Sequence, residues 1–402
     1  MSMGHDAPKR DEDNLAIFDV ARAGAALAVL AAHGRSLLLL DVKDQPDLSA
    51  AGRLFYGVTG LGHQAVIVFF VVSGALVTRA MARLEADGAW SARGFFVARL
   101  SRLWTVLLPC LVLGGMLDRL GTALGDGLVY AGRYGALRPW APPEPIRLDA
   151  TALVGNIGFL QTIAVPTFGT NVPLWSLANE AWYYLAAFLL WSAWRNRARP
   201  VRTGLWVAGA GLVWCVVLTP DMRWLAPTWA IGAAFTLFGM KPRRSVPETR
   251  WPWRLLTTCL LLAAVAGARA TAVHHLLAGD YLVAVATVFW LWSWQKWQPQ
   301  SSAALKAVRR GAQLSYSLYL SHFPLLALVA AVVLRNQRQP FGQAGLSLLL
   351  ASCLAALGYA ALIWWCFERH TGAVRVWASR RLAPAGPPIR VAVHPSLEGT
   401  VP

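Results

Sequence analysis

The sequence predicts an all-α fold, a polytopic transmembrane helical bundle, from three observations. Charged residues make up only 14% of the chain and hydrophobic residues 56%, whereas a soluble domain carries about 25% charged residues. The apolar residues gather in blocks close to the roughly 20 residues that a helix needs to cross a bilayer. Basic residues gather in alternate connections between these blocks, as the positive-inside rule requires. These features place the chain in a lipid bilayer.

The blocks predict about ten spans, and the basic connections place both termini in the cytoplasm, which an even span number permits. They lie at approximately 15–40, 63–82, 101–122, 173–194, 203–219, 223–240, 254–272, 279–296, 311–334 and 343–367. We expect a polar cytoplasmic tail over 1–14 and a transmembrane domain over 15–370 with a large outer loop at about 123–172. Residues 371–402 are expected to form a flexible cytoplasmic tail. An apolar stretch at 152–165 is too short to span, and we expect it in the interface or re-entering the membrane.

Several function classes are disfavoured by composition and motifs. The net charge of +17 would suggest a nucleic-acid partner for a soluble protein, but here the basic residues fall in membrane-flanking loops, so we expect no nucleic acid. The five cysteines show no ligand spacing, which predicts buried thiols and no metal. The sequence also lacks the His-Glu-x-x-His, phosphate-loop and Gly-x-Ser-x-Gly patterns.

Ionisable residues inside a span are costly and usually face a partner or a cavity. In the first span Arg22 and His33 are eleven residues apart, which places them on one helix face with roughly 16 Å between them along the axis. Asp19 lies one turn before Arg22 and is expected to pair with it. The competing interpretation is a structural Asp–Arg pair at one end of the helix and an interfacial histidine at the other.

The second and third spans carry small and basic residues. Ser73 and Gly74 permit close helix packing. Arg99 and Arg102 are three residues apart at the start of the third span, on the side predicted to be cytoplasmic. Two interpretations stay open for this pair: it anchors the helix at the membrane surface, or it clamps phosphate groups, which suit the guanidinium geometry.

The fourth span has a carboxylate near its predicted outer end. Pro173 suits the first helical turn, and Ser176 and Glu180 follow at i,i+4 spacing. A carboxylate at this depth needs a partner or water. A structural salt bridge is the competing interpretation.

The ninth span carries one polar stripe on an apolar helix. Ser315, Tyr319 and His322 follow i, i+4, i+7 spacing, and Pro324 is expected to kink the helix and free backbone carbonyls. The stripe is either part of a site or an interhelical hydrogen-bond seam. Glu368, at the exit of the last span, is expected to face solvent.

Five of these segments, in this order, resemble the acyltransferase-3 family of bacterial membrane O-acyltransferases. They are Arg22 and His33 with ten residues between them, the Phe-Phe-Val-Val-Ser-Gly run at 69–74, the basic run at 99–103, the Trp-Ser-Leu-x-x-Glu segment at 175–180 and the Ser-Tyr-x-x-Tyr-Leu-x-His-x-Pro segment at 315–324. The resemblance covers about residues 15–370. Asn179 stands where the family often carries a further acid, which puts a role for that acid in doubt.

The resemblance implies transfer of an acyl group from acyl-CoA, usually acetyl-CoA, that arrives from the cytoplasm. The implied acceptor is a hydroxyl of a cell-envelope or exported carbohydrate, or of its lipid-linked precursor, at the bacterial inner membrane. His33 is the expected base because imidazole titrates near neutral pH, Glu180 is expected to orient His33 or the acceptor, and Arg22 to hold the donor. Donor binding is expected at Arg22, Arg99, Arg102 and Ser73, and acceptor binding at Trp175, Ser176, Tyr319 and His322.

Two other classes compete with this interpretation. A secondary transporter for a sugar, a lipid-linked sugar or a small metabolite would suit the number of spans and the polar residues at mid-depth, but no inverted halves are evident. A glycosyltransferase for lipid-linked sugars would need an acidic pair in an outer loop, where the sequence offers only Glu144 and Asp149.

Overall fold

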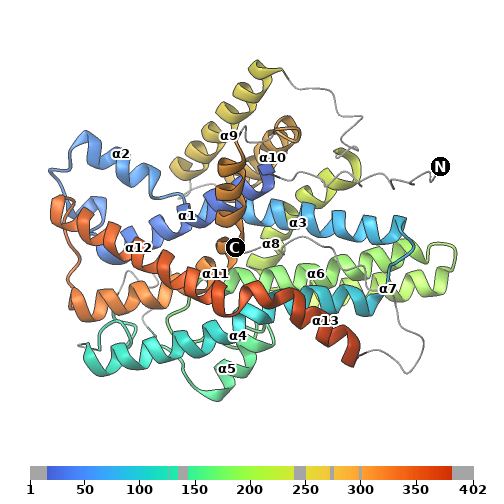
Figure 1. Ribbon diagram of the computed structural model, residues 1–402, viewed down its shortest axis with the longest axis horizontal. Helices are drawn as coiled ribbons and strands as arrows, with labels where there is room; N and C mark the ends of the chain where they lie inside the picture. Colours follow the sequence, from blue (N-terminus) through green and yellow to red (C-terminus); the bar gives the residue numbers. More distant parts are fainter. Residues whose placement is uncertain are drawn as a thin grey trace, which may run out of the picture.

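The computed structural model describes residues 16–125, 127–134, 144–239, 250–271, 276–297 and 301–382. Within these ranges the regular structure is helical, and the remaining backbone pairing is limited to isolated bridges. The helices are α1 (Ala16–Leu38), α2 (Ala50–Val58), α3 (Gly62–Ala86), α4 (Ala92–Leu124), α5 (Ala150–Ile157), α6 (Leu174–Arg195), α7 (Pro200–Leu212), α8 (Pro220–Ala234), α9 (Trp251–Thr271), α10 (Leu276–Ser293), α11 (Ser302–Leu328), α12 (Gln343–Cys366) and α13 (Thr371–Arg381). In Figure 1, α11 runs through the middle of the bundle, and α2 and α7 lie at opposite ends.

The all-α prediction is confirmed, and the protein is a multi-pass membrane protein. Each of the ten predicted spans falls on a long helix. Seven helical stretches of the described residues are long and apolar enough to cross a membrane, and α6, α8 and α10 are not among them. Polar residues interrupt α6, and the apolar run of α10 covers only Leu277–Ser293. The count of ten therefore stays a prediction.

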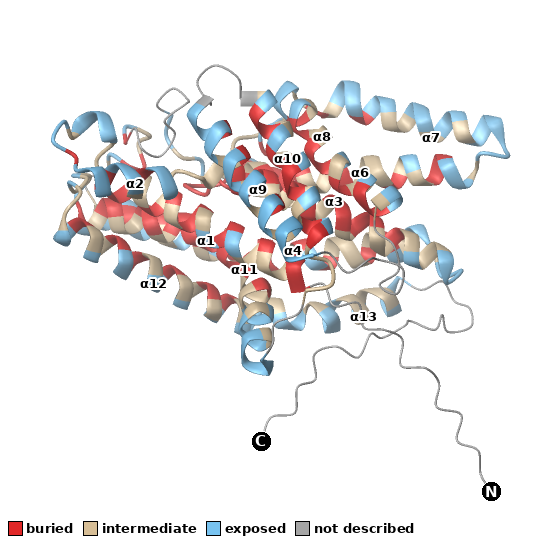
Figure 2. Cartoon of the chain, turned by 90° about the horizontal axis from the view of Figure 1, so that it is seen from above, coloured by how far each residue is buried: buried red, intermediate tan, exposed pale blue. Residues whose placement is uncertain are grey.

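The outward faces of the bundle are apolar. Figure 2 shows α7 mostly exposed, whereas α1 and α11 are largely buried. Large aliphatic side chains point outward from three helices, with Leu205 of α7 69% exposed, Leu262 of α9 62% and Leu354 of α12 58%. Exposed apolar surface on this scale requires a lipid environment, because monomeric soluble proteins rarely carry it.

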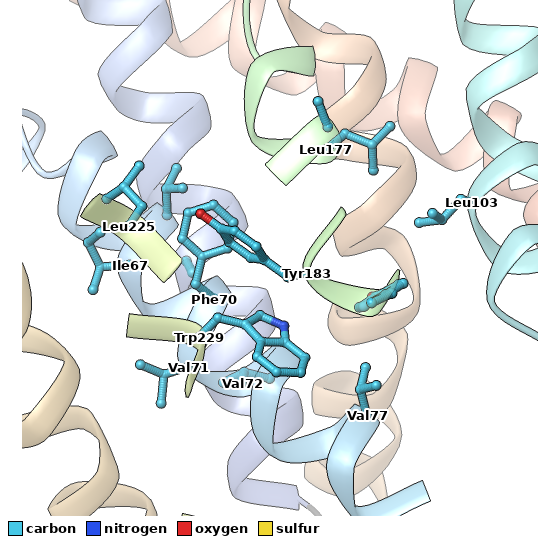
Figure 3. Close-up of a cluster of buried hydrophobic side chains, with 14 of the residues drawn as sticks. Ile67, Phe70, Val71, Val72, Val77, Leu103, Leu177, Tyr183, Leu225 and Trp229 are labelled. Atoms are coloured by element: carbon cyan, nitrogen blue, oxygen red, sulfur yellow. The ribbon is translucent and has the colours of Figure 1, made fainter. Parts of the chain in front are cut away.

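Helices α3 and α8 pack backbone to backbone through two glycines. A Cβ on Gly74 would lie 2.0 Å from the carbonyl oxygen of Trp229, and a Cβ on Gly232 would lie 2.0 Å from that of Val71. Small residues are the usual means of such close approach in membranes. Figure 3 shows the apolar side chains around this contact, with Val71 near Trp229. The predicted packing role of Gly74 is confirmed.

Pro324 frees a backbone carbonyl in α11, as predicted. Proline has no N–H for the carbonyl four residues earlier, which here belongs to Leu320. Asn171 Nδ2 donates to this oxygen at 2.8 Å. Gly114 of α4 faces the proline ring, since a Cβ there would lie 3.3 Å from Pro324 Cγ. The segment of α11 around Pro324 thus contacts Asn171 on one side and α4 on the other.

The apolar stretch at 152–165 packs against α4 and α6. It begins in α5 and continues as irregular backbone whose polar groups find partners inside the protein. The indole nitrogen of Trp104 donates to the Ile157 carbonyl at 3.0 Å, and that of Trp182 donates to the Phe159 carbonyl at 2.9 Å. Irregular backbone at membrane depth needs such internal partners.

A buried carboxylate fixes the segment that leads into α6. Asp118 of α4 is 1% exposed. It accepts from the Thr170 N–H at 2.8 Å and from the Thr170 hydroxyl at 2.6 Å. Gly169 has a φ of 62°, and a Cβ there would lie 2.0 Å from Asp118 Oδ2. Only glycine fits both the conformation and the space.

The C-terminal region differs in part from the predicted flexible tail. Residues Thr371–Arg381 form α13, which lies along α4. Arg93 Nη1 donates to the Leu382 carbonyl at 2.8 Å. The predicted tail at 1–14 and the rest of the C-terminal tail from 383 lie outside the described residues.

The α3–α8 contact predicts a stability effect. Gly74→Ala forces the Trp229 carbonyl to move, and overpacking of this kind costs about 1–3 kcal/mol. We expect a lower midpoint when the fraction of monodisperse protein in detergent is measured after heating. Gly358→Ala in α12 is the matched control, because its Cβ would meet nothing within 4 Å. Equal midpoints for the two variants would contradict the close contact.

Candidate active site

A cavity of about 120 Å³ lies between α1, α3, α4, α6 and α11. At about 10–15 Å³ for each enclosed water, it has room for roughly ten waters. Of the ten site residues chosen from the sequence, seven line it: Arg22, Ser73, Arg99, Arg102, Ser176, Glu180 and Tyr319. The other three, His33, Trp175 and His322, lie outside the lining.

One carboxylate, Glu180, is held inside the cavity. Ser73 of α3 donates to Glu180 Oε1 at 2.6 Å, and the Tyr184 hydroxyl donates to the same oxygen. Ser73 also accepts from the Trp229 indole nitrogen at 3.3 Å. Residues of α3, α6 and α8 therefore fix this carboxylate, and two hydroxyl protons are already committed to it.

Three guanidinium groups face the same space. Arg99 lies over the Tyr184 ring at 5.9 Å and Arg102 over the Tyr316 ring at 6.0 Å, distances at which the ring face attracts a cation. Arg22 Nη2 donates to Ser315 Oγ at 3.3 Å. Arg102 is exposed, so the cavity opens to the surroundings at this residue.

The predicted ion pair of Arg22 with Asp19 is present but long. The two side chains approach to 4.0 Å, the outer limit for an ion pair. Arg22 also donates to Ser315 and lines the cavity. The pair therefore leaves Arg22 able to take a further anionic partner.

The cavity lining has an excess of positive charge. Three arginines face a single carboxylate among the lining residues. Arg99 Nε is buried and has no hydrogen-bond partner within the described part of the chain. A buried donor without a hydrogen-bond partner is costly, and guanidinium groups bind phosphate and carboxylate through paired hydrogen bonds. The residues present fit an anionic ligand such as a phosphate group.

Glu368 belongs to this region, contrary to the expectation that it faces solvent. It is half-buried, and its Oε2 accepts from the Ser317 hydroxyl at 2.5 Å and from the Ser317 N–H at 3.2 Å. Its charge acts on Arg102 and Arg22. A carboxylate just past the end of a span resembles a solvated helix end, so the sequence carries no signal of this contact.

The two histidines bond to each other rather than to the cavity carboxylate. His33 Nδ1 lies 2.8 Å from His322 Nε2, and His322 Nδ1 lies 2.8 Å from the Leu318 carbonyl oxygen. The two rings are 7° from parallel, with 5.1 Å between their centroids. The expectation that Glu180 orients His33 is therefore not met, because the structure gives each residue a different partner.

The polar stripe of α11 is an interhelical seam that also borders the cavity. Ser315 contacts Arg22, Tyr319 contacts Ser176 with 2.6 Å between the hydroxyl oxygens, and His322 contacts His33. The interpretation as an interhelical seam is supported, and a role of the stripe in a functional site stays a prediction. The contact of Arg22 with Ser315 precedes the contact of His33 with His322 along both α1 and α11. The two helices therefore run parallel.

The seam also explains the position of Glu180. Helix α6 runs opposite to α11, since Ser176 meets Tyr319 while Glu180, one turn later, shares the cavity with Arg22. Glu180 therefore lies at the guanidinium end. The histidine pair lies beyond Tyr319, at the other end of the cavity.

Trp175 packs in the protein core. Its ring meets Phe70 edge-on at 6.3 Å, and it is half-buried outside the cavity lining. Two lining residues were missed, Tyr184 and Tyr316. The i,i+4 spacing from Glu180 could have found Tyr184, whereas nothing in the sequence separates Tyr316 from other aromatic residues. The described residues hold no group of three or more His, Cys, Asp and Glu side chains that could bind a metal.

Comparison with known proteins gives one match. Residues 15–365 match the family model described as an acyltransferase domain. No curated protein matches the chain, and no solved structure matches it. The matched range includes the cavity, the histidine pair and all five motifs that carry the resemblance. The chain therefore belongs to the acyltransferase-3 family and is a membrane acyltransferase.

Proposed function

We propose that this acyltransferase moves an acetyl or other short acyl group from acyl-CoA to a hydroxyl of a cell-envelope or exported carbohydrate, or of its lipid-linked precursor. The observation that carries the proposal is the cavity with three guanidinium groups and one carboxylate, which ends next to a pair of imidazoles. The first feature suits a phosphate-bearing donor, and the second suits proton transfer.

The proposed setting is the bacterial inner membrane, with ten spans and both termini in the cytoplasm. Two observations support this topology. Helices α1 and α11 run parallel, as the first and ninth spans must, and α6 runs opposite to α11, as the fourth span must. The guanidinium end then faces the cytoplasm, where coenzyme A is found.

The donor would bind through its charged and its apolar parts separately. Arg22, Arg99 and Arg102 would hold phosphate groups, and Ser73 borders the same space. The inner part of the cavity, about 120 Å³, would take only part of a coenzyme A molecule. The nucleotide part would therefore stay at the open side near Arg102, and only the thioester arm would enter, along the wall that includes Phe69 and Phe70.

The chemistry needs a base, an attacking hydroxyl and stabilisation of an oxyanion. His33 would take the proton of the acceptor hydroxyl, whose oxygen then attacks the thioester carbonyl carbon. The hydroxyls of Tyr319 and Ser176, which bond to each other at 2.6 Å and to the Pro173 carbonyl, would have to leave these partners to donate to the developing oxyanion. When the carbon–sulfur bond breaks, His33 returns the proton to the sulfur, so the products are an ester and free coenzyme A.

Glu180 has a different role in this mechanism from the one expected from the sequence. Its two hydrogen-bonded hydroxyls and its neighbouring arginines make it a counter-charge that keeps the guanidinium groups in position. It would therefore act on donor binding, and His33 would work without it as a direct partner.

Replacing the base is the first test. His33→Ala should lower transfer at least about 100-fold, the lower end of the general-base contribution. We would measure free thiol release from acetyl-CoA by the protein in nanodiscs, with and without cell-envelope glycan. Size-exclusion chromatography checks that the variant is folded. Undiminished transfer by folded His33→Ala protein would remove this role.

Replacing a cavity arginine should weaken donor binding. A hydrogen bond to a charged group contributes about 1.5–3 kcal/mol, so Arg99→Gln should bind radiolabelled acetyl-CoA roughly 10–100-fold more weakly, and Arg99→Lys should lose less. Arg202→Gln is the control, because Arg202 is exposed on α7. Equal affinity in all variants would contradict the phosphate clamp.

Movement of labelled sugar across sealed vesicles without consumption of acetyl-CoA would favour the transporter instead.

A further inference from the structure

The protonation of the histidine pair can be assigned from its hydrogen bonds. His322 is 1% exposed, and its Nδ1 lies 2.8 Å from the Leu318 carbonyl oxygen. A carbonyl oxygen only accepts, so Nδ1 of His322 must carry a hydrogen. A neutral imidazole has one N–H and one acceptor nitrogen. His322 Nε2 is therefore an acceptor.

The assignment passes from one ring to the other. His322 Nε2 lies 2.8 Å from His33 Nδ1, and because the former accepts, the latter must donate. With its hydrogen on Nδ1, neutral His33 has its lone pair on Nε2. The two ring planes are 7° from parallel. The N–H of His33 therefore points along the lone pair of His322 Nε2, which lies in the plane of its ring.

We propose that His322 is a positioning residue that holds His33 as the Nδ1–H tautomer and leaves Nε2 as its basic nitrogen. This inference rests on one part of the proposed function, the role of His33 as the base. It replaces the expectation that His322 binds the acceptor. An orienting partner on the far nitrogen of a catalytic histidine is a general requirement of acyl transfer, and loss of the right tautomer can cost about 10⁴-fold in rate.

A neutral partner suits this position in the bundle. The ring neighbours that the structure gives the pair are Tyr319 and Phe323, and the nearest cavity carboxylate, Glu180, is occupied at the guanidinium end. A carboxylate beside His33 would have to be buried in apolar surroundings, which is costly without a permanent cation. The lone pair of His322 instead accepts from His33 in both protonation states of the base.

Two substitutions of similar size separate positioning from packing. In His322→Gln the side-chain carbonyl can accept from His33 Nδ1, whereas in His322→Leu no acceptor remains. Nitrogen NMR of the ¹⁵N-histidine-labelled protein in nanodiscs reports which ring nitrogen carries the hydrogen. The signals of His33 are identified by their loss in His33→Gln.

We expect His33 to carry its hydrogen on Nδ1 in the wild type and in His322→Gln, and to shift toward Nε2–H in His322→Leu. The turnover number should fall at least about 100-fold in His322→Leu and stay within about tenfold in His322→Gln, while the KM for acetyl-CoA is unchanged in both. A merely structural role would lower the amount of folded protein and leave the tautomer of the remaining fraction as it was.

The inference is overturned if His33 carries its hydrogen on Nε2 in the wild type, or if folded His322→Leu keeps the Nδ1–H form. Should His322→Leu not fold, the wild-type and His322→Gln spectra still decide the tautomer. If the spectra are as expected but His33→Ala transfers the acyl group fully, the role of His33 as the base is refuted, whereas the tautomer assignment stands. Failure of the inference and failure of the proposed function are thus distinguishable.

Discussion

Three guanidinium groups that line one cavity of an apolar bundle, two of them half-buried, are the constraint on which the rest of this structure depends. Each must meet an anion, a polar atom or a ring face, because an unpaired charge in apolar surroundings is costly. Glu180 and Glu368 supply two negative charges, the rings of Tyr184 and Tyr316 lie against two of the cations, and Ser315 meets the third. The positive charge that remains would favour an anionic ligand in the cavity, as the proposed function requires.

Keeping these groups in place requires helices that approach closely and do not slide. Gly74 and Gly232 bring α3 and α8 into backbone contact, and this contact sets Ser73 beside Glu180. Helix α11 is held by Asn171 at the carbonyl that Pro324 frees. The first contact places the Ser73 hydroxyl at the cavity, and the second fixes the helix that carries Ser315 and Tyr319. The residues that pack the helices together therefore also set the positions of the site residues.

Much of the architecture could be predicted because it is periodic along one chain. The span positions, the shared face of Arg22 and His33 and the polar stripe of α11 each depend on spacing within a single helix. Which helix meets which does not follow from spacing, and this is where the expectations failed. Glu180 was expected to orient His33 or the acceptor, and Glu368 to face solvent, because a single sequence carries no record of the contacts of Glu180 with Ser73 and of Glu368 with Ser317.

The separation of charge from proton transfer follows from the same constraint. The arginines that line the cavity with Glu180 give this carboxylate a counter-charge at the guanidinium end. At the histidine end no permanent cation is present in the described contacts, and a carboxylate there would be buried alone. A second imidazole gives His33 an acceptor without adding a formal charge. The bundle therefore places its ionised groups where an anionic donor would bind and its neutral pair where a hydroxyl would lose a proton, with Tyr319 and Ser176 between the two.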